Sequence, residues 1–276
     1  MIRIRIILSF LFITIILGLF LLPRGVVDNG GNNLNAKELG NDRLSDSISL
    51  SIADAHEEMS DELKVKINSL KVRLEKAGQS NSQSIIDSLT AIFKSASQFD
   101  SAAIYYEKLV PIYNDEEHIL NAADLYYEAY SYAMNRERAS YLGGKARLYY
   151  SMILENDSTR LDLKNKIAMT FVSSSNPMRG ITMLREILQA DPENENAIFN
   201  MGLLSLQSGQ YSRAVEYFKS LTELSPDNMQ GQFYLGLCFY ELGDELRAKT
   251  QFELVKSMAN DPTILATVQS YLDEIN

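Results

Sequence analysis

The side chains that could carry catalytic or metal chemistry are few and far apart. The two histidines, His56 and His118, are separated by 62 residues, and neither has a third ligand indicated nearby. The single cysteine, Cys238, lies in the apolar run LGLCFY. One cysteine can form neither an intrachain disulfide nor a thiolate cluster, and a zinc site needs more ligands than two distant imidazoles provide. The sequence therefore predicts no metal site and a packed, unreactive thiol.

Sequence motifs typical of catalysis are also missing. The chain has no G-x-S-x-G nucleophile elbow, no phosphate-binding loop and no H-E-x-x-H metal motif. The step Gly143-Gly144-Lys145 lacks the strand and spacing of a phosphate loop, and we interpret it as a loop or the start of a helix. We therefore expect a protein that is not an enzyme, with no cofactor and no small-molecule substrate.

Composition places the chain among folded proteins. Of its 276 residues 46% are hydrophobic and 22% are charged, which excludes disorder over the whole length. The net charge is -10. A chain this acidic lacks the clustered positive charge that binding to phosphates needs, so we expect no nucleic-acid partner.

The N-terminus has the pattern of a membrane anchor. Residues 6–22 form an apolar run of 17 residues without a charge, near the minimum that spans a bilayer as a helix. The run is longer than a signal-peptide core, and no A-x-A pattern follows it. We predict an uncleaved signal anchor within residues 1–24, and keep a cleaved, secreted form as the alternative. Arg3 and Arg5 precede the run, which favours an N-terminus inside and the rest of the chain in the periplasm.

A linker and a helix follow the predicted anchor. Residues 25–50 are rich in Asn, Asp, Ser and Gly, and we interpret them as a flexible tether. A flanking helix is predicted within 51–78, starting at about Ile52, with Gly78 as its C-cap. Its apolar residues share one stripe: Leu63, Ile67, Leu70, Leu74 and Ala77. Two heptads are too few to indicate a coiled coil, so we expect this stripe to pack against the next element.

The rest of the chain repeats itself at an offset of 34 residues. The offset relates Gly202 to Gly236 and Phe218 to Phe252, and it also relates three further pairs: Pro192 and Pro226, Gly209 and Gly243, Ala214 and Ala248. The second unit carries ten extra residues between Leu109 and Ala146. Each unit holds two segments with small and large residues at helical spacing around a short turn. A lone helix pair cannot bury both faces, so the units must stack.

This pattern resembles the tetratricopeptide repeat, although the tryptophan of that family is missing. The resemblance covers residues 79–276 and implies an all-α, right-handed solenoid of five helix pairs, at about 83–116, 117–160, 161–194, 195–228 and 229–262. A capping helix over 263–276 would close it. The run from Lys164 to Phe218 is also similar to membrane-anchored repeat proteins of the Bacteroidota group.

The resemblance further implies a site for a protein or peptide partner. Arrays of this family bind peptide segments on a concave surface lined by the first helix of each unit. The residues expected on that surface are Asn165, Met169, Phe199, Asn200, Leu203, Gln230, Phe233, Tyr234, Leu237 and Tyr240. Only Asn200 matches the family's carboxylate clamp, so we expect an apolar groove with amide edges instead. The alternative is that Phe199, Leu203 and Phe233 only seal adjacent units.

Tyrosines concentrate in one part of the chain, since ten of the fifteen fall between Tyr105 and Tyr150. Tyr106 and Tyr150 occupy packing positions of the repeat. For Tyr127, Tyr130 and Tyr132, both an aromatic ligand patch and simple packing stay open.

Together these features predict a membrane-tethered scaffold for protein–protein interactions that helps to organise a complex of the cell envelope. The alternative is a regulatory subunit of an envelope enzyme or transporter.

Overall fold

A computed structural model describes residues 59–275 of the chain. The predicted anchor (1–24), the linker (25–50) and the first residues of the predicted flanking helix lie outside the described residues. In the part that the structure describes, each helix is too short or too polar to traverse a bilayer.

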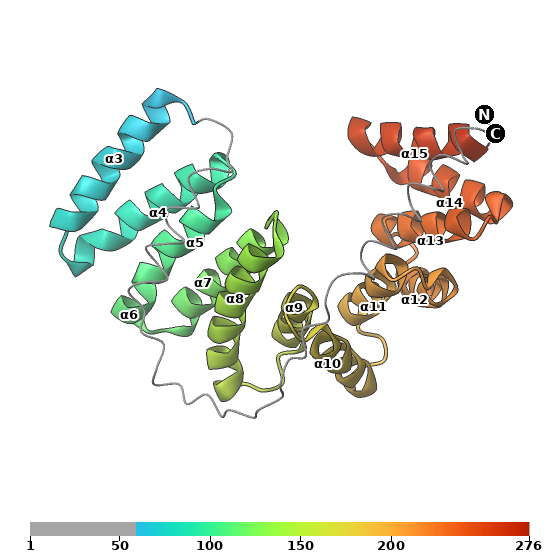
Figure 1. Ribbon diagram of the computed structural model, residues 1–276, viewed down its shortest axis with the longest axis horizontal. Helices are drawn as coiled ribbons and strands as arrows, with labels where there is room; N and C mark the ends of the chain where they lie inside the picture. The colour runs from blue at the N-terminus through green and yellow to red at the C-terminus, as the bar shows by residue number, and fades with distance from the viewer. Residues whose placement is uncertain (1–58, 276) are drawn as a thin grey trace, which may run out of the picture. The chain divides into compact units, whose positions relative to one another are not determined.

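The described residues fold into consecutive helices that pack in chain order as antiparallel neighbours (Figure 1). The all-α repeat array predicted from the sequence is therefore confirmed for this part of the chain. The helices are α3 Asp61–Lys76, α4 Gln79–Ser95, α5 Phe99–Tyr106, the 3₁₀ turn η2 Glu107–Leu109, α6 Val110–Tyr113, α7 Glu116–Ser131, α8 Arg136–Asn156, α9 Leu161–Val172, α10 Pro177–Ala190, α11 Glu195–Gln207, α12 Tyr211–Leu224, α13 Met229–Glu241, α14 Glu245–Met258 and α15 Pro262–Ile275.

Helix α3 packs its apolar stripe against α4, as expected. Ile67 and Leu70 are buried there with residues of α4, while Leu63 and Leu74 cover the edges. The predicted limits of this helix are wrong at both ends. The helix begins only after Ser60, whose hydroxyl accepts a hydrogen bond from the Leu63 amide, and it ends at Ala77 in an extended conformation. Gly78 precedes α4 instead of capping α3.

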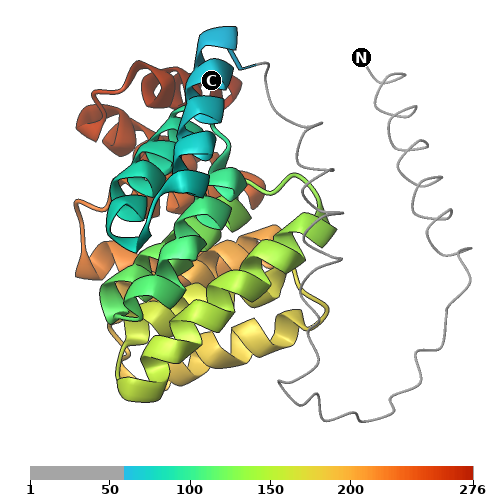
Figure 2. The ribbon, with the colours of Figure 1, turned by 90° about the vertical axis from the view of Figure 1, so that its left-hand side faces the viewer.

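The second helix pair accommodates its extra residues by lengthening both helices. Helices α7 and α8 run for 16 and 21 residues, against 13 and 14 in α11 and α12. Gly143 and Gly144 lie in the middle of α8, so their interpretation as a loop or helix start is wrong. A Cβ at Gly143 would lie 3.1 Å from Thr170 Cβ and 3.2 Å from the Tyr130 ring, so glycine is placed where α7 and α9 approach α8. Figure 2 shows these long helices side by side.

The later pairs follow the repeat closely. Phe218 is fully buried, and its ring fills the space beside Gly202, where a Cβ would lie only 2.8 Å from the ring. Gly209 and Gly243 occupy the turns with φ of 73°, a conformation that glycine adopts without steric cost. The last helix, α15, buries Val268 and Leu272 in the same core as α12 and α14.

Candidate protein-interaction surface

The residues predicted to line the concave surface all lie on first helices of their pairs. Asn165 and Met169 are on α9. Phe199, Asn200 and Leu203 are on α11, and the other five, Gln230, Phe233, Tyr234, Leu237 and Tyr240, are on α13. Gln230 is exposed, while eight of the remaining nine are half-buried. We call the apolar members on α11 and α13, together with Tyr271 of α15, the aromatic row: Phe199, Leu203, Phe233, Tyr234, Leu237, Tyr240 and Tyr271.

Rings of the aromatic row connect adjacent helix pairs. The Phe199 ring lies 5.9 Å from that of Phe218 in its own pair and 5.7 Å from that of Tyr234 in the next. Phe233 repeats this arrangement at the following junction, 5.9 Å from Phe252 and 6.0 Å from Tyr271. Both phenylalanines thus help to seal the units and still present part of each ring to solvent.

Tyr271 joins this row although the sequence analysis did not single it out. It stacks on Phe252 at 5.0 Å and meets Tyr240 edge-on at 5.4 Å, and Tyr240 donates a hydrogen bond to Glu274 at 2.6 Å. The signal was present, because Tyr271 follows Leu237 by the repeat offset. The register of the repeat therefore continues into the capping helix.

Asn165 is not a groove residue, which corrects the prediction. It is only 4% exposed, and its amide donates to Asn194 Oδ1 at 3.0 Å and to the Leu161 carbonyl at 3.3 Å. Asn194 caps α11 by accepting from the Ala197 amide. Asn200 donates to Asn165 Oδ1 at 3.4 Å, so its amide is also engaged between units. A buried amide has to find partners within the protein, and this one joins α9 to the start of α11.

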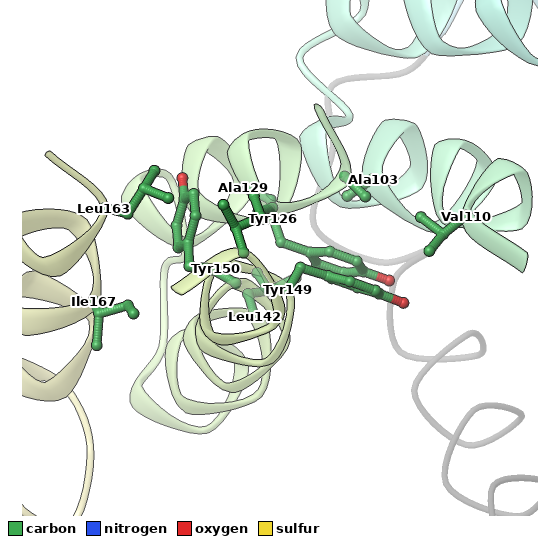
Figure 3. Packing of buried hydrophobic residues seen from close by; sticks show 13 residues of the cluster. Ala103, Val110, Tyr126, Ala129, Leu142, Tyr149, Tyr150, Leu163 and Ile167 are labelled. Atoms are coloured by element: carbon green, nitrogen blue, oxygen red, sulfur yellow. The ribbon is translucent and has the colours of Figure 1, made fainter. Parts of the chain in front are cut away.

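The tyrosine-rich part of the chain is organised around two carboxylates. Glu107 accepts hydrogen bonds from the hydroxyls of Tyr126 and Tyr149 and from Lys145 Nζ at 2.8 Å. Figure 3 shows the Tyr126 and Tyr149 rings stacked with their hydroxyls at the same end, and Tyr150 turned the other way toward Leu163. Burial alone would raise the pKa of Glu107, but the bonds from Lys145, Tyr126 and Tyr149 together lower it below its usual value.

The second carboxylate, Asp124, accepts from the Tyr150 hydroxyl at 2.5 Å and from Lys166 Nζ at 2.6 Å. Burial and the nearby Asp124 raise the pKa of Tyr150, so its hydroxyl stays a donor. These bonds join α7, α8 and α9 and have the character of structural links.

The three tyrosines left open by the sequence have different surroundings. The Tyr130 hydroxyl donates to the Met169 carbonyl at 2.7 Å, and Tyr127 packs near both Tyr130 and Tyr150. Tyr132 stacks on Phe99 at 4.3 Å, yet 64% of its surface stays exposed. The three do not gather into one ligand patch.

The two residues considered for metal or thiol chemistry within the described range are both packed. His118 is buried, stacks on Tyr113 at 4.3 Å and pairs with Asp115, which caps α7. Cys238 is fully buried, and burial with the nearby Glu241 raises the pKa of its thiol to about 12.

An array of stacked antiparallel helix pairs with a partly exposed apolar row defines the class of helical-repeat proteins. Within that class, residues 199–255 match the tetratricopeptide repeat family, and the chain is a tetratricopeptide-repeat protein. Repeats of this family are typically non-catalytic and mediate interactions with proteins or peptides.

Solved structures share the fold at low sequence identity. A tetratricopeptide repeat protein from Parabacteroides merdae, of the Bacteroidota, superposes with a TM-score of 0.53 at 18% identity, covering 77% of this chain and 82% of its own. A thermophilic tetratricopeptide-repeat protein from Thermus thermophilus gives 0.51 at 15% identity, covering 71% of this chain and 99% of its own. No curated protein matches the sequence.

Proposed function

We propose that this chain is a non-enzymatic scaffold that binds a protein or peptide partner through the aromatic row, while an N-terminal helix tethers it to a membrane and the repeats lie in the periplasm. There it would help to assemble or organise a complex of the cell envelope. The observation that carries the binding role is the continuity of the row across α11, α13 and α15, with its side chains half-buried. Rings and aliphatic groups held this way offer apolar area whose conformation is already fixed.

The binding role is tested by crosslinking in the native membrane followed by purification of the full chain. Leu203 and Leu237 occupy the same position in adjacent units and are half-buried. Changing both to glutamine removes apolar contact area from the row and leaves its rings in place. We expect the crosslinked partner to be lost from this variant.

The matched control changes Leu224 and Leu254 to glutamine on the second helices α12 and α14. These leucines are 39% and 40% exposed and lie outside the row. The control variant should keep the partner. Partner recovery from both variants alike would exclude the row as the binding surface.

The tether and the orientation are tested separately. The motivation is the apolar run at residues 6–22 with Arg3 and Arg5 before it. A phosphatase that is active only outside the cytoplasm, fused after Asn276, should be active and remain with the membrane. Soluble activity would mean that the leader is cleaved, and absence of activity would mean that the orientation is reversed.

A further inference from the structure

An open groove of ≈ 470 Å³ lies at the edge of the array between the third and fourth predicted units. It is placed where the helices turn: Val172 ends α9, Met178 begins α10, Gln207 ends α11, and Gln210 precedes α12. This edge is distinct from the aromatic row, because none of the row residues lines it.

The floor and walls of this groove are apolar. Met178 and Ile181 from α10 face Met201 and Leu204 from α11 across it. Ile181, Met201 and Leu204 also belong to the core between these helix pairs, which fixes their positions. Met178 is 57% exposed, so an uncovered thioether lies at the rim. Flexible, polarisable methionine side chains adapt well to varied apolar partners.

The charge of the groove is opposite to that of the chain. Arg185 on α10 and Arg213 on α12 line it, and no Asp or Glu does. Within the part of the chain that the structure describes, neither guanidinium forms an ion pair or hydrogen bond, and both are exposed. In a protein with a net charge of -10, two free arginines beside an apolar groove form a local site for negative charge.

We propose that this groove is a second docking surface, which binds an acidic segment of a protein partner. An aliphatic or aromatic side chain of the segment enters between α10 and α11, and flanking Asp or Glu side chains pair with Arg185 and Arg213. Because the two cations come from different helices, carboxylates on both sides of the apolar residue match them better than one terminal carboxylate. The groove and the aromatic row use different residues, so either can fail without the other.

The test uses the purified full chain in detergent and a defined pool of decapeptides. The peptides are N-acetylated and C-amidated, with Asp or Glu at six positions around two central residues chosen from Leu, Ile, Met and Phe. A second pool carries Asn and Gln in place of the acids, and a third carries Ser and Gly in place of the apolar pair. We expect the first pool to be retained at least tenfold above both others, and its retention to fall as salt rises.

The variant Arg185→Glu/Arg213→Glu should lose that retention by tenfold or more. The matched control, Arg73→Glu/Lys76→Glu, makes the same change in net charge on exposed residues of α3 and should bind like the wild-type chain. Far-UV circular dichroism confirms that each variant is folded. Equal retention of the first and second pools, or full retention by the arginine variant, would overturn the proposal. Equal retention of the first and third pools would overturn it as well, since binding would then need charge alone.

Discussion

Gly180 allows α10 to approach α9 more closely than any other residue would. A Cβ built there would lie 2.3 Å from the carbonyl oxygen of Ala168 and 3.3 Å from Phe171 Cβ. The first of these neighbours is backbone of the facing helix, which cannot rotate away. Gly180→Ala therefore has to push the two helices apart.

The size of the effect follows from that distance. Carbon and carbonyl oxygen usually meet at 3.3–3.6 Å, so the helices would separate by roughly 1 Å. A gap of that size forfeits roughly a quarter to a half of the dispersion energy of the contacts it opens, here those of the fully buried Ala168 and Leu184. Overpacking of this kind costs about 1–3 kcal/mol, while replacing glycine within a helix returns about 1 kcal/mol. We expect a net loss of about 1–2 kcal/mol in the free energy of unfolding.

The same substitution at Gly144 provides the control. Gly144 also lies inside a helix, but its Cβ would meet only the flexible Arg147 Nη2, at 3.6 Å. Gly144→Ala should therefore stabilise the chain by about 0.5–1 kcal/mol. Urea unfolding followed by far-UV circular dichroism compares both variants with the wild-type chain. If Gly180→Ala is as stable as Gly144→Ala, the close approach of α9 and α10 is not what requires glycine.

Three further predictions follow from the packing and the protonation states. Phe199→Ala and Phe233→Ala should each lower the free energy of unfolding by about 1–3 kcal/mol, less than a fully buried ring, because part of each ring is exposed; a loss of partner binding with unchanged unfolding would instead show that the rings act only as binding anchors. Glu107 has a pKa below its usual value near 4.5, so its stabilisation is complete above that pH and is lost as pH falls through the lower folded value. Glu107→Gln should therefore cost about 1–3 kcal/mol in urea unfolding at about pH 7 and clearly less at about pH 3, and an equal cost at both would contradict the assigned charge. Because burial raises the pKa of the Cys238 thiol to about 12, iodoacetamide should label it slowly at about pH 8 in the native chain and rapidly in urea, and fast labelling of the native chain would show that the site opens.

The helix pairs could be predicted because their packing needs are written at a fixed offset. Gly202 and Gly236 stand beside Phe218 and Phe252, and each large ring fills the space that a small residue leaves. The third pair carries Ala168 and Leu184 at these positions. A leucine reaches less far than a phenylalanine, so an alanine is tolerated opposite it. Sequence alone thus specifies small and large positions, and with them the helix pairs.

The candidate surface could be predicted less well, because position on a helix does not fix what a side chain meets. Asn165 occupies the same repeat position as Phe199, yet it is buried because the Asn194 cap of α11 lies within hydrogen-bond distance. Gly143 suggested a loop, since its reason for being glycine is the approach of α7 and α9 rather than a turn. Both outcomes depend on neighbours from other units, which the repeat offset does not identify.

The acidic-segment groove lies where the third unit departs from the repeat. Its turn, residues 173–176, is one residue longer than the turn at 208–210, and it carries Met178 where the fourth unit has Ser212. A repeat position is constrained by the neighbour it packs against, so its residue type reports the fold. A position that leaves the pattern without entering the core, as Met178 does at 57% exposure, is free of that constraint. In this array such positions are therefore the better guide to a binding site, and at this edge they surround a groove with two unpaired arginines.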